Sequence, residues 1–187
     1  VIIYQESGST AQQFKFVKNS DGSYRIYTKA SSDASCVEVD DALTSSGANV
    51  QQWTANGHAC QNWYLTQVDY QVEEEESSVE ESSVEQSSEE ESSSTTTQLA
   101  ASALVDGAYY MIQNVNSGLY MEVEGAAAAN STNVQQWGAY GASAHNVWRA
   151  EYAGSGYYKL YSKLPCFATR LIIHRRILLL ILFYLIG

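Results

Sequence analysis

The sequence contains few positive charges. Only 10 of its 187 residues are Lys or Arg, against 21 Asp and Glu. A protein that follows a phosphate backbone needs a face rich in Lys and Arg, so we exclude nucleic acid as a partner. The formal net charge of −11 is concentrated in one segment, because ten glutamates between Glu73 and Glu91 account for all but one unit of it. The rest of the chain is nearly neutral.

The sequence also lacks a hydrophobic run of membrane-spanning length. The apolar run from Ile177 to Ile186 is about half as long as a spanning helix requires. Basic residues at 174–176 interrupt its extension upstream. We therefore do not expect a membrane partner. The tail, residues 165–187, differs in composition from the Gly-, Asn- and Tyr-rich sequence before it. We interpret it as an out-of-frame or truncated end, with a short tail anchor as the alternative.

Cysteines are few and odd in number: Cys36, Cys60 and Cys166. A bridge between Cys36 and Cys60 is compatible with the sequence, but we do not expect it. The cysteines therefore do not define the cellular compartment. The chain starts at Val1 in a strand-like stretch, which we interpret as a cut end.

Motifs for catalysis and for metal binding are absent from the sequence. It contains no Gly-rich phosphate loop, H-E-x-x-H, C-x-x-C or G-x-S-x-G. The three histidines (His58, His145 and His174) share no metal-ligand spacing. Glycoside cleavage needs two carboxylates that flank a cleft, and Glu38 with Asp40 and Asp41 supplies only the residue type. We expect no enzyme activity, no metal and no cofactor.

Residues 71–98, QVEEEESSVEESSVEQSSEEESSSTTTQ, repeat the letters ESSV and contain no aromatic residue. Like charges repel one another there, and nothing in the stretch can be buried. We therefore predict a disordered acidic linker over 71–103. Binding of calcium or of a basic partner is the alternative, but it would require carboxylates held in a fixed geometry.

Two stretches on either side of this linker are copies of one another. NVQQWTANGHACQNW, residues 49–63, and NVQQWGAYGASAHNVW, residues 133–148, both contain a Q-x-W followed by a second Q-x-W-like pair. Asp21 and Trp63 are 42 residues apart, as are Asp106 and Trp148. The chain therefore contains an internal repeat.

Each copy holds four short strand-like runs separated by Gly, Asn, Ser and Asp. In the first copy these runs lie at 24–28, 36–39, 49–53 and 63–65, and neither copy shows a helical period. The predicted fold class is all-β. Four short strands cannot bury their own apolar face, so such units pack around a shared axis, and three of them would close a barrel.

The combination of motifs resembles one known family. D-G-x-Y, an acidic residue before Val, N-V-Q-Q-W and a second Q-x-W-like pair are similar to the ricin B-chain type lectins and family 13 carbohydrate-binding modules. The resemblance covers residues 1–66 and 104–163. It implies a β-trefoil built from three Q-x-W repeats.

Under this resemblance the chain divides into four parts. Residues 1–70 match the end of a trefoil, 71–103 the linker, 104–164 the beginning of another trefoil, and 165–187 the tail. The two trefoil parts can also complete each other as one circularly permuted trefoil. Its third repeat would combine 151–163 with 1–16 and lack one strand, the equivalent of 36–39. We expect this arrangement for the chain.

The resemblance also implies a sugar site in each copy. In the family, the acidic residue accepts sugar hydroxyls, the first Q-x-W supplies an aromatic plate, and polar residues before the last tryptophan donate hydrogen bonds. The first candidate site is Glu38, Gln51, Trp53 and Gln61, with His58 and Asn62 nearby. The second is Glu122, Gln135, Trp137 and Asn146, with His145 and Tyr140 nearby.

Some of these residues have a structural alternative. Trp63, Trp148 and Phe14 are predicted core residues, together with Leu65, Ile26, Ile112 and Tyr109. Gln12, Gln61 and Asn146 could instead satisfy buried backbone groups. Cys60 and His145 replace the family's frequent asparagine, and glutamate replaces its usual aspartate. The third repeat offers only Tyr4 as a plate, with no acidic partner, so we expect no site there.

The predicted function is non-catalytic carbohydrate binding by a secreted, extracellular, monomeric module. It would target a glycan-degrading enzyme to polysaccharide that contains galactose, xylose or arabinose. Repeated weak sites would raise avidity. The alternative is a protein-interaction trefoil whose sugar sites have decayed and whose tail tethers it to a membrane.

Overall fold

The computed structural model describes residues 1–69, 104–138, 141–164 and 169–172. The predicted linker, 71–103, lies entirely outside these residues, and so does the predicted tail except for 169–172. All the helical elements of the described residues are short 3-10 turns, namely η1 (Thr10–Gln12), η2 (Lys29–Ser31), η3 (Asp40–Ala42), η4 (Ala59–Gln61) and η5 (Glu124–Ala126). The prediction of an all-β fold is confirmed.

Within the described residues, twelve strands form one sheet and fall into three groups of four. The first repeat contains β3 (Tyr24–Thr28), β4 (Ser35–Val39), β5 (Val50–Thr54) and β6 (Asn62–Val68). The second contains β7 (Tyr109–Asn114), β8 (Tyr120–Val123), β9 (Val134–Trp137) and β10 (Val147–Gly154). The third contains β11 (Tyr157–Ser162), β12 (Thr169–Ile172), β1 (Ile2–Gln5) and β2 (Phe14–Lys18).

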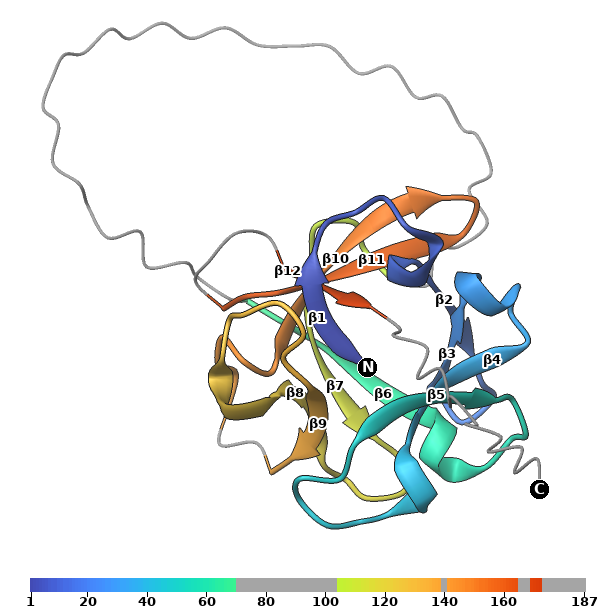
Figure 1. Ribbon diagram of the computed structural model, residues 1–187. Coiled ribbons are helices and arrows are strands. Elements are labelled where there is room, and N and C mark those ends of the chain that lie inside the picture. Colours follow the sequence, from blue (N-terminus) through green and yellow to red (C-terminus); the bar gives the residue numbers. More distant parts are fainter. Residues whose placement is uncertain (70–103, 139–140, 165–168, 173–187) are drawn as a thin grey trace, which may run out of the picture.

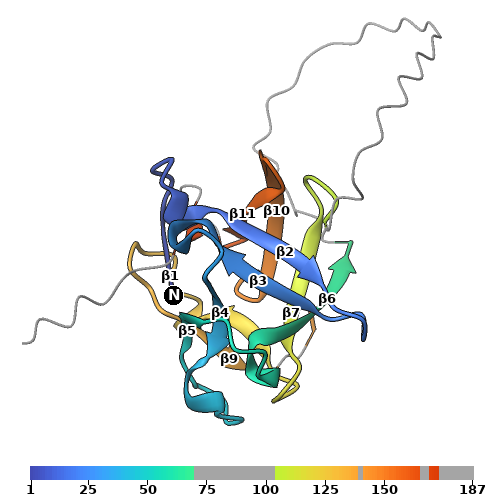
Figure 2. The same ribbon diagram turned by 90° about the vertical axis from the view of Figure 1, so that its right-hand side faces the viewer.

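Six of these strands close into a barrel. The antiparallel pairs run β2 with β3, β3 with β6, β6 with β7, β7 with β10, β10 with β11, and β11 back to β2. The other six strands pair as β4 with β5, β8 with β9, and β12 with β1. Figures 1 and 2 show these outer pairs arranged around the barrel. A six-stranded barrel with three outer pairs is the β-trefoil, in the permuted arrangement predicted above.

The third repeat is complete, which corrects one prediction. Strand β12 pairs antiparallel with β1, with Ile172 opposite Ile2 and Leu171 opposite Ile3. It therefore stands where β4 and β8 stand in the other repeats. The expectation that this strand is lacking was wrong, because it treated the sequence from Pro165 onward as a tail outside the trefoil, whereas Thr169–Ile172 forms β12. The division into parts of two trefoils stays a prediction.

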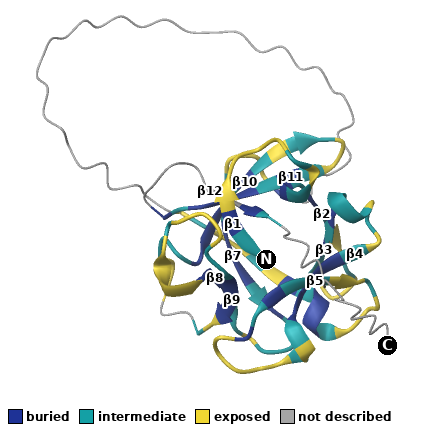
Figure 3. Cartoon of the chain, in the orientation of Figure 1, coloured by how far each residue is buried: buried dark blue, intermediate teal, exposed yellow. Residues whose placement is uncertain are grey.

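The barrel interior repeats one residue pattern three times. Trp63, Trp148 and Phe14 occupy equivalent positions and are fully buried. A second buried set consists of Ile26, Ile112 and Leu160. Each of them lies two residues after the residue that pairs with one of these aromatic residues on the neighbouring strand. Burying a side chain of this size contributes about 1.5–3 kcal/mol. Figure 3 shows buried strand residues and exposed connections. Leu65 and Tyr109, also predicted for the core, are only partly buried.

The outer pairs are tied to one another by backbone hydrogen bonds. Gly47 N donates to Gln136 O, and Ile3 N donates to Thr132 O. The amino group of Val1 donates to Val50 O at 2.6 Å. Each repeat therefore touches the next, and the outer pairs hold their side chains on a connected frame.

Candidate functional site

The first site lies on the β4–β5 hairpin. Glu38 stands opposite Gln51 and Cys36 opposite Trp53. Side chains two residues apart on a strand share a face, so Gln51 and Trp53 extend to the same side as Glu38. Trp53 is 56% exposed whereas Glu38 is 6% exposed. A broad aromatic surface therefore stands at the rim of a site with a carboxylate at its base.

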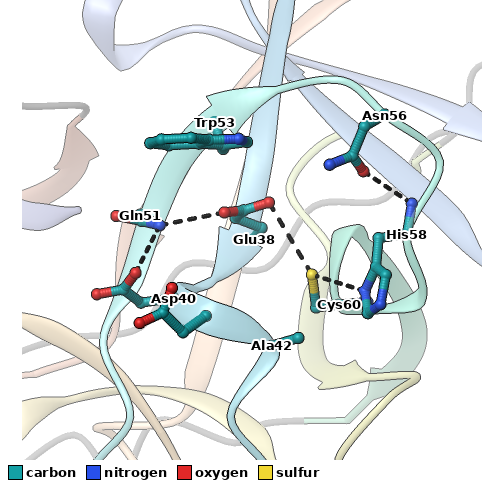
Figure 4. Close-up of a pocket in the computed structure, with 9 residues that line it drawn as sticks. Glu38, Asp40, Ala42, Gln51, Trp53, Asn56, His58 and Cys60 are labelled. Carbon is teal, nitrogen blue, oxygen red and sulfur yellow. Dashed lines mark hydrogen bonds between the residues drawn. The ribbon is translucent and has the colours of Figure 1, made fainter.

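These residues line a pocket of about 450 Å³, which Figure 4 shows with the ring of Trp53 above Glu38 and Gln51. Its lining consists of Glu38, Asp40, Asp41, Ala42, Gln51, Trp53, Asn56, His58 and Cys60. Of the first site's predicted residues, the structure brings Glu38, Gln51, Trp53 and His58 together here. Pockets of this size hold small ligands.

Amide groups hold Glu38 from two sides. Gln51 Nε2 donates to Glu38 Oε1 at 3.1 Å, and Gln61 Nε2 donates to Oε2 at 2.8 Å. Each carboxylate oxygen has two lone pairs, and Oε2 also has the Cys60 thiol at 3.9 Å, so Oε1 keeps capacity for a further donor. The side chain is therefore fixed in place and still able to accept hydrogen bonds from a ligand.

Asp40 extends the hydrogen-bond network toward the pocket mouth. Gln51 Nε2 also donates to Asp40 Oδ1, at 2.8 Å. The next residues, Asp41 and Ala42, have positive φ angles of 50° and 53°, so the chain turns sharply just after Asp40. This turn, η3, brings two carboxylates to the pocket that carries Glu38.

The opposite wall carries a thiol and an imidazole. Cys60 Sγ lies 3.1 Å from His58 Nδ1 and 3.9 Å from Glu38 Oε2. Burial, and then the nearby charge of Glu38, raise the pKa of the Cys60 thiol to about 11. The thiol is therefore protonated at neutral pH, and its S–H group can donate to the carboxylate.

The second site repeats the hairpin with different surroundings. Glu122 stands opposite Gln135 on β8 and β9, and Gln135 Nε2 donates to Glu122 Oε1 at 3.0 Å. His145 Nε2 lies 3.5 Å from Glu122 Oε2. Trp137 is 41% exposed, and the position of a Cβ on Gly47 would be 3.5 Å from its ring. Tyr140 lies outside the described residues.

Gln61 and Asn146 brace the loops that follow the outer hairpins. Gln61 donates to Thr54 O and accepts from the backbone N–H groups of Asn56 and Gly57. Asn146 donates to Gly141 O and accepts from Ser143 N. Both are almost fully buried. The structure thus shows the bracing alternative for both residues, while contact with a sugar stays a prediction.

The third repeat has a different set of residues at this position. Tyr4 occupies the place of the tryptophan and is 39% exposed. Ile2 and Ile172 face each other where the other repeats pair glutamine with glutamate. No carboxylate comes from those two positions, and the absence of a sugar site from this repeat stays a prediction.

Sequence reasoning placed no role on Asp40, Asp41, Asn56 or Gly47 in these sites. Asp40 and Asp41 follow Glu38 closely, and an acidic pair ahead of a run of small residues was a usable signal for a turn beside the site. Nothing in the spacing of the repeat indicated that Gly47, from the first repeat, approaches Trp137 of the second.

Three further properties concern the described residues only. Cys36 and Cys60 are both free thiols there. The ranges that can be described contain no group of three His, Cys, Asp or Glu side chains arranged to hold a metal ion. Within the same ranges, no helix has the length and apolar character to cross a membrane.

The chain forms a closed trefoil barrel in which two of the three repeats carry an exposed tryptophan and a buried glutamate on one hairpin. The family model described as ricin-type beta-trefoil lectin domain-like matches residues 10–100 and 97–164. The chain belongs to this family.

The search of solved structures gives several matches. A designed threefold symmetric protein, ThreeFoil, is 23% identical, with 88% of this chain and 90% of that chain covered and a TM-score of 0.47. An exo-β-1,3-galactanase from Clostridium thermocellum is 19% identical, with 83% of this chain and 23% of that chain covered and a TM-score of 0.48. The search of curated proteins gives no match.

Proposed function

We propose that the chain is a non-catalytic carbohydrate-binding module whose main site is the first one. The observation that carries the proposal is the 56% exposed ring of Trp53 above a buried carboxylate that two glutamine amides hold in place. The exposed ring of Trp53 contributes little to stability, because it buries little apolar area there. The ring above a fixed carboxylate suits a ligand with one apolar face and several hydroxyls.

A pyranose ring has these properties. Its C–H face would pack on Trp53, and its hydroxyls would donate to the free lone pairs of Glu38 and Asp40. Gln51 would fix both acceptors, because its single amide group donates to each of them. His58 would add a polar contact from the opposite wall. Galactose, xylose and arabinose units remain the expected ligands.

The second site would bind in the same way through Trp137, Glu122 and Gln135. In this site the carboxylate of Glu122 accepts from one amide instead of two, and an imidazole lies near this carboxylate instead of a thiol. Two sites on one rigid trefoil would let the module hold one polysaccharide at two points, which raises avidity. Secretion and the targeting of a glycan-degrading enzyme are part of the proposal, on the grounds of family membership.

The test is a titration followed by tryptophan fluorescence. Galactose, lactose, xylan fragments and arabinoxylan fragments would be added to the full chain and to Trp53→Ala and Trp137→Ala. We expect saturable quenching, reduced most strongly in Trp53→Ala, because the stacking surface is lost. Tyr64→Ala is the matched control, because this exposed aromatic residue on β6 is not among the pocket residues.

Circular dichroism would show that each variant remains folded. A folded protein whose tryptophan fluorescence does not change with any of the glycans would contradict the proposal. That result would favour the alternative, a protein-interaction trefoil whose sugar sites have decayed.

A further inference from the structure

The pocket of the first site carries an excess of negative charge. Three of its nine lining residues are carboxylates, Glu38, Asp40 and Asp41, and none is Lys or Arg. Within the described residues, the Lys and Arg side chains that form ion pairs do so with other carboxylates, namely Glu6, Asp33 and Glu151. The three carboxylates of the pocket therefore have no cationic partner from Lys or Arg within the part of the chain that the structure describes.

The three carboxylates differ in how many hydrogen bonds hold them and in how exposed they are. Glu38 accepts from two amides, and Asp40 accepts from one of the same amides through Oδ1 only. Asp40 is half-buried and Asp41 is exposed at the mouth of the pocket. Glu38 is thus fixed at the base, while Asp40 and Asp41 present negative charge along one side of the space below Trp53.

We infer that the first site prefers a sugar that carries a protonated amino group over the corresponding neutral sugar. This inference rests on the proposed function, since it names the ligand class of the same site. An ammonium group has three donors and a positive charge, so it would satisfy Asp40 and Asp41 better than a hydroxyl does. The face of Trp53 would also attract a nearby cation.

The second site provides an internal contrast. Glu124 and Gly125 stand where the first site has Asp40 and Asp41, so one of the two carboxylates is absent. Both sites contain an imidazole, His58 in the lining of the first pocket and His145 at 3.5 Å from Glu122. The second site therefore differs by having one carboxylate fewer, and we assign the preference for an amino sugar to the first site alone.

The experiment measures the ratio of two affinities at the first site. Trp137→Ala serves as the background, so that Trp53 is the exposed tryptophan that reports binding. Galactosamine is compared with galactose and with N-acetylgalactosamine at pH 6, and the glucosamine series is measured in parallel to cover the other stereochemistry. The N-acetylated sugars carry the same nitrogen without its charge.

We expect the amino sugar to bind about fivefold tighter than the neutral one at low salt, the upper range for partly exposed charge pairs. The advantage should shrink toward one in 0.5 M NaCl, because salt of this strength screens exposed charges. Asp41→Asn and Asp40→Asn should each lower the ratio. Asparagine tolerates the positive φ of position 41, so the Asp41→Asn turn should persist.

Glu124→Gln is the matched control, because it removes one carboxylate at the equivalent position of the second repeat. It should leave the ratio at the first site unchanged. A ratio of one in the background protein, with galactose still binding, would overturn the inference and leave the proposed function standing. A ratio that persists in both Asp→Asn variants would also overturn it. No binding of any sugar would instead refute the proposed function.

Discussion

The first and second sites share their hairpin and differ in their surroundings. In both, a glutamate faces a glutamine across the strands and a tryptophan is exposed two residues later. Around Glu38 there are two amides, a thiol and two further carboxylates in the pocket. Around Glu122 there are one amide and an imidazole. The same motif therefore supports two sites with different charge.

The difference arises from the turns and loops rather than from the strands. Asp40 and Asp41 belong to the turn η3, and Cys60 and Gln61 belong to η4. The strands only fix where the tryptophan and the glutamate stand. A repeat can consequently change its ligand through substitutions in the turns while the barrel stays the same.

Removing each glutamate should expose the largest difference between the two sites. Glu38→Ala leaves one N–H of Gln51 and one of Gln61 without an acceptor, whereas Glu122→Ala leaves only one of Gln135. We expect Glu38→Ala to lower the free energy of unfolding by about 2 kcal/mol and Glu122→Ala by about 1 kcal/mol. Urea denaturation followed by circular dichroism measures both.

Equal losses of stability in the two alanine variants would break the comparison. Glu38→Gln and Glu122→Gln keep the side-chain length, and they test whether the charge or the shape of the side chain is responsible.

A substitution in the β4–β5 loop of the first repeat, which approaches Trp137, should affect only the second site. Gly47 has φ +83°, and an added Cβ would meet the ring of Trp137 at 3.5 Å. We expect Gly47→Ala to lower the free energy of unfolding by about 1 kcal/mol, because an L-residue is strained in the left-handed region. It should also shift the fluorescence of Trp137, recorded in a Trp53→Phe background.

Gly22→Ala is the control for this substitution. Its φ is +86° and nothing lies within 4 Å of the added Cβ, so it carries similar backbone strain without the contact to Trp137. If Gly22→Ala shifted the tryptophan fluorescence as strongly, the link between Gly47 and the second site would be refuted.

At neutral pH the smallest expected effect concerns the two thiols of the first repeat, because their contribution begins only in alkaline solution. Burial raises the pKa of Cys36 to about 12 and that of Cys60 to about 11. The folded chain therefore keeps these protons at a pH where the unfolded chain has lost them. Folding stability should fall as the pH rises from about 9, the ordinary value, toward 11. Below pH 9 the two thiols should make no pH-dependent contribution.

Alkylation by iodoacetamide, followed by mass spectrometry in a Cys166→Ser background, tests the state of the thiols. At pH 8 both should react much more slowly in the folded chain than in urea, because the thiolate is the reactive form. Rapid modification of Cys60 in the folded protein would show that the thiol is not held neutral beside Glu38.

Much of the fold could be predicted from the spacing of the repeat. The predicted run at 24–28 coincides with β3, and the other three runs of the first copy differ from their strands by one or a few residues at their ends. Trp63 and Trp148 are in the core as expected. Strand β12 was missed because its sequence, TRLI, lies beyond Pro165, in the segment that was interpreted as a tail.

The candidate site could be predicted only in part. Its hairpin residues follow from the motif, since strand alternation places Gln51 and Trp53 on one face. The contributions of Asp40 and Asp41 depend on positive φ angles after the strand, and the contact between Gly47 and Trp137 joins two repeats. Such features depend on turn geometry and on packing between repeats, which a linear motif does not record.

The pairing of β6 with β7 has a consequence for protein engineering. These strands are paired from Trp63 with Asn114 to Val68 with Tyr109, so the chain leaves one strand and re-enters its immediate neighbour. The entropy of closing such a connection grows only with the logarithm of its length. This connection is therefore a suitable insertion site. Another domain whose own termini lie close together could replace it without moving β6 or β7.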